Sequence, residues 1–177
     1  MNFLKIRKKF NIFQGLTDEE ALSVIQDIKI STFKYGDFVF YEGDITKDFY
    51  YILEGEVTIV LDKFLEMTNI EERSKKEESF LPTKLKSSNI LERFVEITTL
   101  KKGDIFGEIS FLANEPRNAG VRIKDKNPVT LLSFQIKEND DAIDNKNAQI
   151  SLYKNITKLL VRKLKNTNKI VAGLKII

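Results

Sequence analysis

A short stretch past the middle of the chain holds the residue types that bind a phosphate group. Gly107 precedes Glu108, and Arg117 lies nine residues after that carboxylate, between Pro116 and Asn118. The glycine predicts the start of a short helix, where free backbone N–H groups and a partial positive charge favour an anion. An arginine adds a fork for two phosphate oxygens, and a carboxylate suits a sugar hydroxyl. These residues predict a pocket for a small sugar phosphate.

The stretch 106–121 resembles the phosphate-binding cassette of the cyclic nucleotide-binding domain family, of the catabolite activator and protein kinase A regulatory subunit type. The family pattern is roughly F-G-E-[LI]-[AS]-L, a short loop, and P-R-x-A. Here it reads Phe106-Gly107-Glu108-Ile109-Ser110-Phe111 and then Pro116-Arg117-Asn118-Ala119. The resemblance implies a cyclic mononucleotide as the ligand.

The resemblance assigns a role to most residues of the cassette. Gly107 lets the backbone approach the phosphate without a Cβ in the way, Arg117 is the charge partner, and Glu108 holds the ribose 2′-hydroxyl. The candidate phosphate donors are the backbone N–H groups of Ile109, Ser110 and Ala119. Taken alone, Arg117 would be an ordinary surface-loop arginine, and Glu108 an acidic residue in a first helical turn.

Asn118 is where the chain departs from the family pattern. The family usually has Ala, Ser or Thr here; Ser or Thr tends to bond the guanine amino group, and Ala is typical of many cyclic-AMP sensors. Asn offers both a donor and an acceptor. It could contact either base or the phosphate, so the choice between cyclic AMP and cyclic GMP stays open. Gly120, where Thr or Ala is common, is a smaller departure.

Five further residues are candidates for contact with the base. Counting along the strands places Ile59, Ile97 and Thr98 where the family's pocket walls lie. Thr167 and Asn168 occupy the place of a Thr-Ser pair that meets adenine on the catabolite activator's long helix. Neighbouring helix residues point about 100° apart, so one can face its own pocket and the other a dimer seam. Alternatively, both are ordinary polar residues in a seam.

Composition excludes several classes of chemistry. The 177 residues include no cysteine and no histidine, which removes disulfides, thiolate and histidine metal sites, and histidine acid–base catalysis. A metal-dependent enzyme on a cupin-like barrel is disfavoured for the same reason. We therefore expect no catalytic activity, no metal and no cofactor.

Charge and hydropathy predict a soluble cytoplasmic protein. The net charge is only +3, from 29 basic and 26 acidic side chains, which is weak evidence for nucleic-acid binding. No apolar run approaches the ~20 residues that span a bilayer. Residues 1–10 alternate charged and apolar groups too closely for a secretion signal. Direct DNA binding through the basic residues of the last helix is a rival without a groove-reading motif. Those residues are Arg162, Lys163, Lys165 and Lys169.

The hydrophobic pattern predicts a β-rich fold with flanking helices. Short β-branched and aromatic runs alternate with Gly-Asp turns about ten residues apart, which indicates a jelly-roll-like barrel or sandwich, by resemblance eight-stranded. The runs are 31–35, 38–41, 48–53, 57–61, 94–100, 121–123 and 129–134. We divide the chain into an N-terminal helical segment (1–27), a barrel (28–136) and C-terminal helices (137–177).

The N-terminal half contains a helix-capping pattern and, at its end, a long polar segment. Thr17 and Glu20 form a capping-box pattern ahead of a helix whose apolar face is Ala21, Val24, Ile25 and Ile28. Residues 63–92 are polar and mixed in charge, where the family usually has a short hairpin. We expect a solvated insertion; a partner-docking element would have to use the Phe80-Leu81 pair.

The C-terminal helix carries a heptad pattern, with steps of three and four residues. The seam consists of Ile150, Tyr153, Thr157, Leu160, Leu164, Thr167, Val171 and Leu174. It could pack on the barrel, but we favour a homodimer through this helix.

The sequence thus predicts a cytoplasmic sensor of cyclic AMP or cyclic GMP. By resemblance, the ligand favours a state in which the C-terminal helix closes over the base. Because the chain stops soon after that helix, we expect a stand-alone domain without a helix-turn-helix, whose output passes through an effector protein. The alternative is an interaction module that kept the barrel and lost the ligand. The affinity, the partner and the role of the insertion are left open.

Overall fold

The computed structural model describes residues 3–63, 93–137 and 143–174. The chain divides into two compact units, one of residues 1–29 and 133–177 and the other of residues 30–132. The expected insertion, apart from Lys63, lies outside the described residues, as does the Phe80-Leu81 pair.

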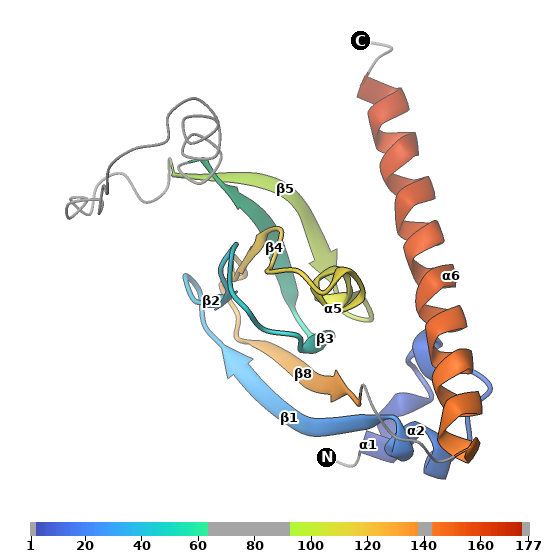
Figure 1. Ribbon diagram of the computed structural model, residues 1–177. Helices are drawn as coiled ribbons and strands as arrows, with labels where there is room; N and C mark the ends of the chain where they lie inside the picture. Colours follow the sequence, from blue (N-terminus) through green and yellow to red (C-terminus); the bar gives the residue numbers. More distant parts are fainter. Residues whose placement is uncertain (1–2, 64–92, 138–142, 175–177) are drawn as a thin grey trace, which may run out of the picture. The chain divides into compact units, whose positions relative to one another are not determined.

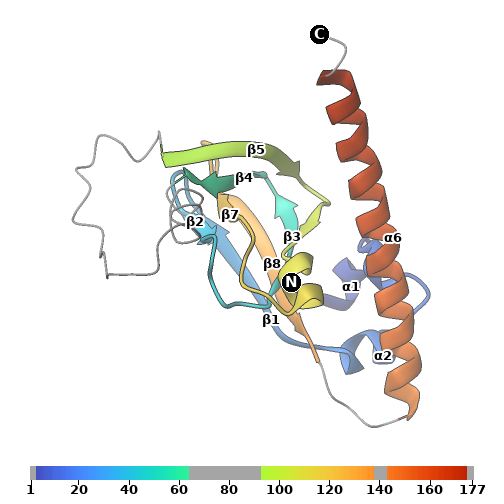
Figure 2. The same cartoon turned by 45° about the horizontal axis from the view of Figure 1, so that its top comes forward.

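Eight strands form two four-stranded sheets, as predicted. The orders are β1-β8-β3-β6 and β2-β7-β4-β5; Figure 1 labels most of these strands, and Figure 2 labels β7. The strands are β1 (Ile25–Phe33), β2 (Phe38–Phe40), β3 (Phe49–Glu54), β4 (Glu56–Asp62), β5 (Phe94–Lys101), β6 (Ile105–Phe106), β7 (Gly120–Arg122) and β8 (Val129–Ile136). The short helix α5 (Glu108–Ala113) lies between β6 and β7.

The core of the β unit comes from the alternating apolar residues of these strands. Successive side chains of a strand point to opposite faces, and β8 alternates buried and half-buried positions along most of its length. The buried cluster consists of Phe40, Ile52, Val57, Phe106, Val121, Ile123, Val129 and Leu131.

The Gly-Asp turns share one hydrogen-bond pattern, which explains why this dipeptide recurs. In each turn the aspartate side chain accepts a hydrogen bond from the backbone N–H three residues earlier: Asp37 from Lys34 at 2.7 Å, Asp44 from Tyr41 at 2.8 Å, and Asp104 from Lys101 at 2.9 Å. Aspartate is favoured in turns for this side-chain bonding. The preceding glycines have φ between +88° and +95°.

The structure differs from the sequence expectation at two strands. The helix α2 (Asp18–Ser23) is shorter than expected, and β1 begins at Ile25, so Ile25 and Ile28 are not on a helix face. Both are β-branched, and a strand suits that side chain better than a helix does. Strand β6 has two residues, too few for a periodic signal; it pairs with β3 through Tyr50 and Phe106.

The other unit is helical. It contains α1 (Phe3–Arg7), the 3-10 turn η1 (Asn11–Phe13), α2 and the long helix α6 (Ile143–Leu174). The predicted capping box is confirmed: Glu20 N–H donates to the Thr17 hydroxyl at 3.1 Å, and Thr17 N–H donates to the Glu20 carboxylate at 2.6 Å. In both views α1 and α2 lie beside the N-terminal half of α6 (Figures 1 and 2).

Helix α6 packs against the N-terminal segment through a face other than the predicted seam. The buried side chains on α6 are Ala148, Leu152, Asn155, Ile156 and Leu159. Asn155 donates to the carbonyl oxygens of Ile12 and Gln14 at 3.1 and 2.8 Å. The seam residues Ile150 and Leu164 are 51% and 61% exposed.

Candidate functional site

The cassette begins with a glycine that no other residue could replace without strain. Gly107 precedes α5 with φ +87°, in the left-handed region. A Cβ at this position would lie 2.5 Å from the Asp48 carbonyl oxygen and 2.9 Å from Arg117 Nη1. The space that a Cβ would fill at Gly107 is therefore already taken by the protein's own groups.

Arg117 is a buried residue of the β unit, with 2% of its surface exposed. Its Nε donates to the Thr46 hydroxyl at 3.0 Å, Nη1 to the Gly107 carbonyl at 2.9 Å, and Nη2 to the Asp48 carbonyl at 2.8 Å. All three acceptors are uncharged oxygens. Within the part of the chain that the structure describes, no carboxylate lies within ion-pair distance of this guanidinium.

An aromatic wall lies against the same guanidinium. Its central carbon is 4.2 Å from the Phe40 ring centroid and 5.9 Å from that of Tyr50. Tyr50 in turn stacks on Phe106, with ring centroids 5.1 Å apart. An aromatic face attracts a cation, so the rings help to hold Arg117 in the interior.

The electrostatics of the site are set by burial. Burial lowers the pKa of Arg117, and Tyr50, Asp48, Asp44 and Glu108 oppose this change. Arginine nonetheless stays protonated in proteins. The site therefore contains a desolvated cation with acidic groups nearby but no directly paired anion. A bound anion would be stabilised by its attraction to this cation.

Three comparisons place this geometry among known proteins. No family model matches the chain. A cGMP-dependent protein kinase of Plasmodium berghei is 30% identical over 120 residues, which are 68% of this chain and 10% of the kinase. The regulatory domain of Toxoplasma gondii PKA, solved with cAMP, has a TM-score of 0.55 and 19% identity, over 93% of this chain and 49% of that one.

A regulatory subunit of a cAMP-independent protein kinase A from Trypanosoma brucei has a TM-score of 0.57 and 18% identity, over 99% of this chain and 51% of that one. The chain has the cyclic nucleotide-binding domain fold. It spans about half the length of these two solved regulatory chains and a tenth of the kinase.

The cyclic nucleotide-binding fold brings the predicted phosphate-site residues together in one unit. Gly107 contacts Arg117, and Glu108 and Ser110 are both buried at 2% exposure on α5. Ile109 and Asn118 are exposed, and Ala119 is half-buried.

The base candidates of the β unit lie on neighbouring strands. Ile59 on β4 pairs with Thr98 on β5, and the register shifts immediately afterwards, so that Ile97 falls at a bulge. A bulge re-aims side chains, so counting by two does not fix the side that Ile97 faces. Ile59 packs against the core cluster.

The other two base candidates lie on α6, in the helical unit. Thr167 and Asn168 are both exposed, and the Thr167 hydroxyl donates to the Lys163 carbonyl at 3.1 Å. This local bond occupies the hydroxyl proton on the helix itself.

Sequence reasoning missed four residues of the site: Phe40, Thr46, Asp48 and Tyr50. Thr46 and Asp48 lie about 70 positions from Arg117 along the chain, and no periodic signal connects them. The turn at Gly43 and Asp44 was visible in the sequence, but its contact with Arg117 was not.

Two further features are absent from the described residues. These residues hold no cluster of three acidic side chains suited to a metal ion. None of the helices among these residues is long and apolar enough to cross a membrane.

Proposed function

We propose that the β unit binds a cyclic mononucleotide and that Arg117 is the charge partner of its phosphate. The observation that carries this proposal is a buried guanidinium that touches Gly107 and has no carboxylate partner among the described residues. In a low-dielectric site, an ion pair between Arg117 and a bound anion contributes more binding free energy than a pair on an exposed surface does.

We propose the remaining roles from the resemblance of the cassette. The backbone N–H groups of Ile109, Ser110 and Ala119 donate to the phosphate, and Glu108 accepts from the ribose. The base lies toward Ile59, Ile97 and Thr98, and Asn118 is available to its polar edge. Thr167 and Asn168 are the candidate base contacts on α6. The named relatives include one called cGMP-dependent and one solved with cAMP, so both ligands belong in the test.

The test is isothermal titration of the full chain with cyclic AMP and with cyclic GMP. Wild type should bind at least one of them, and Arg117→Leu should lose binding. Arg162→Leu is the matched control, because Arg162 is an exposed arginine on α6. Since Arg117 also bonds three protein oxygens, thermal unfolding of Arg117→Leu must be recorded to confirm that the variant is folded.

The second candidate function is an interaction module that binds no nucleotide. It is favoured by the three internal hydrogen bonds of Arg117, which hold the guanidinium without any ligand. One protein of the same fold is described as the regulatory subunit of a cAMP-independent kinase. If wild type binds neither nucleotide at millimolar concentration, this second function replaces the first.

As a sensor, the protein would respond through α6. Ligand binding shifts the population toward a state in which α6 closes over the base, and a cytoplasmic effector protein reads that state. Backbone hydrogen exchange along α6 should slow when the nucleotide is added. Exchange that is unchanged by a saturating nucleotide would argue against closure.

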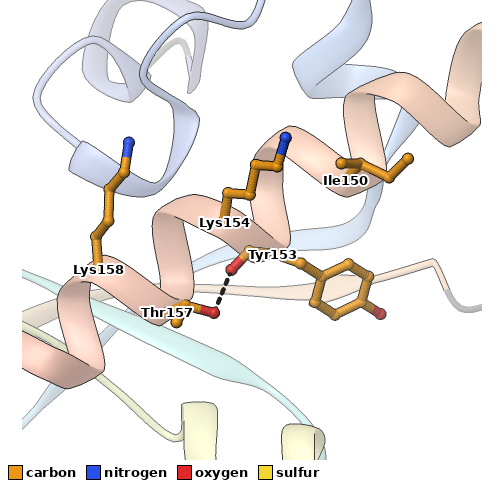
Figure 3. A pocket seen from close by; sticks show the side chains of 5 residues that line it. All are labelled: Ile150, Tyr153, Lys154, Thr157 and Lys158. Atoms are coloured by element: carbon orange, nitrogen blue, oxygen red, sulfur yellow. Dashed lines mark hydrogen bonds between the residues drawn. The ribbon is translucent and has the colours of Figure 1, made fainter.

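We also propose that the exposed seam of α6 pairs with a second copy of the chain. Figure 3 shows a shallow hollow on this helix, lined by Ile150, Tyr153, Lys154, Thr157 and Lys158, with the two lysines projecting together away from the Tyr153 ring. Burying the exposed apolar side chains of this seam against a second copy would be favourable, because it removes apolar surface from water.

Charge placement on α6 is compatible with a parallel arrangement. In a parallel pair with Ile150 at position a, flanking g and e positions meet across the seam. Gln149 would then face Lys154 of the second copy, and Lys163 would face Asn168. No two lysines are opposed in these pairs, although α6 carries seven basic side chains and one acidic one.

A further inference from the structure

One loop holds Arg117 by both its backbone and its side chain. The loop of residues 41–48 joins β2 to β3. Gly43 N–H donates to the Arg117 carbonyl at 2.7 Å, and Arg117 N–H donates to the Asp44 carbonyl at 2.9 Å. The same loop supplies Thr46 and Asp48 to the guanidinium. The loop therefore holds the arginine in place without the help of a ligand.

The two contacts that the loop makes with the Arg117 side chain fall on one edge of the guanidinium. In arginine, Nε and Nη2 direct N–H groups the same way, as one side of a rigid fork. The Thr46 hydroxyl accepts from Nε–H and the Asp48 carbonyl accepts from Nη2–H. The loop therefore occupies the edge that could otherwise donate two parallel hydrogen bonds to an anion.

Not every N–H group of the guanidinium is used by the protein. A guanidinium has five N–H groups, and three of them donate to Thr46, Gly107 and Asp48. Two remain, one on each terminal nitrogen, without a partner among the residues that the structure describes. These two N–H groups can meet an anion only while the plane of the guanidinium is fixed.

We infer that Thr46 is a positioning residue for the anion site, which helps to fix the plane of the Arg117 guanidinium for the phosphate of a cyclic nucleotide. Thr46 is exposed on its loop, and its hydroxyl accepts from Arg117 Nε. This inference rests on the proposed nucleotide binding, which it deepens by assigning one of the three contacts that orient the guanidinium to a hydroxyl of the loop.

The alternative is that Thr46 is an incidental neighbour. In that case the Gly107 and Asp48 carbonyls, with the Phe40 ring, would hold the guanidinium unaided. The two cases differ in ligand affinity: only the positioning role predicts that removing this one hydroxyl from an exposed loop weakens nucleotide binding.

The experiment compares three substitutions in the full chain. Thr46→Val keeps the shape and removes the acceptor, and Thr46→Ser keeps the hydroxyl. Thr130→Val is the matched control, because Thr130 is a half-buried threonine on β8, outside both the cassette and the 41–48 loop. The ligands are cyclic AMP and cyclic GMP, titrated calorimetrically.

The positioning role predicts that Thr46→Val weakens binding about tenfold or more, the usual effect of losing a hydrogen bond to a charged group. Thr46→Ser should restore affinity to within a few-fold of wild type, and Thr130→Val should leave it unchanged. Equal affinities for wild type and Thr46→Val would overturn the inference.

A second readout does not depend on the ligand. In protein labelled with ¹⁵N-arginine, the Nε–H signal of Arg117, identified by its absence in Arg117→Lys, should exchange slowly with water in wild type and Thr46→Ser. It should shift and exchange faster in Thr46→Val. If wild type binds no nucleotide, the proposed function fails; an Nε–H signal insensitive to Thr46→Val refutes the positioning role separately.

Discussion

At the scale of single residues, Gly107 and Arg117 depend on each other. The glycine has no Cβ, and the space that this leaves is bordered by Arg117 Nη1 and by the Asp48 carbonyl oxygen. The arginine in turn donates to the Gly107 carbonyl. A change at either residue therefore affects the other, and a second glycine with positive φ, which has no such neighbours, separates the effect of backbone conformation from that of the contact.

We expect Gly107→Ala to destabilise the protein more than Gly36→Ala. Both glycines have positive φ, +87° and +90°, so each alanine costs about 1 to 2 kcal/mol of backbone strain. Only at position 107 does the new Cβ meet atoms, at 2.5 Å; at Gly36 nothing lies within 4 Å. Urea denaturation of both variants measures the difference. Equal losses of unfolding free energy in the two variants would mean that the Asp48 carbonyl and Arg117 move away from the new Cβ at little cost.

Tyr50 makes the stability of the site sensitive to alkali. Burial, helped by Asp48 and Asp44, raises its pKa above the ordinary value of 10.0. The folded state therefore holds the phenolic proton to higher pH than the unfolded state does. The resulting stability is fully present below pH 10 and is lost as the pH rises through the raised pKa.

Replacing Tyr50 with Phe should flatten part of that alkaline decline. Tyr51, whose pKa burial also raises, would supply the part that remains. The measurement is the free energy of unfolding between pH 9 and pH 11.5 for wild type and Tyr50→Phe. A decline of the same slope in both proteins would contradict the assignment.

The residue scale also marks the limit of sequence reasoning. Gly107, Glu108 and Arg117 could be predicted because their types and spacing are constrained along a short segment. Thr46 and Asp48 could not, because they meet Arg117 only after the chain has folded across about 70 positions. Neither has a residue type that is unusual in a turn.

At the scale of elements, Asn155 connects α6 to the N-terminal segment. Its side-chain amide is buried and donates to two carbonyls near η1. Asn155→Ala leaves those carbonyls without their donor, and we expect a loss of about 1 to 3 kcal/mol. Asn166→Ala, an exposed asparagine on the same helix, should cost only a few tenths. Thermal and urea unfolding would measure both, and equal effects would contradict the proposed anchoring.

The same residue explains why the packed face of α6 was hard to predict. The heptad steps indicated a long helix, which the structure contains. The seam that they indicated is exposed, while the face that packs within the unit includes a polar side chain at position 155. An asparagine interrupts an apolar stripe in the sequence, although in the fold it is satisfied by backbone carbonyls that no pattern reveals.

At the scale of the whole molecule, the proposed dimer depends on an apolar seam beside many cations. Leu164 is 61% exposed and sits in the middle of that seam. We expect Leu164→Lys to shift the chain from dimer to monomer, because a charge at a core position of a coiled coil is costly to bury. Analytical ultracentrifugation over a concentration series measures this.

The control for that experiment is Asn166→Lys, which adds the same charge to the same helix outside the seam. It should leave the dimer in place, apart from a modest dependence on salt. A wild-type chain that sediments as a monomer at all concentrations would refute pairing through α6, while leaving nucleotide binding untouched.

The bonds from the loop to Arg117 also have a consequence for kinetics. A guanidinium that is already fixed by Thr46, Gly107 and Asp48 needs no rotation when a small anion arrives. The encounter step would then be limited by diffusion, and its rate constant should fall in proportion as glycerol thickens the solvent. Any slower phase in stopped-flow traces would report a later event than capture of the phosphate.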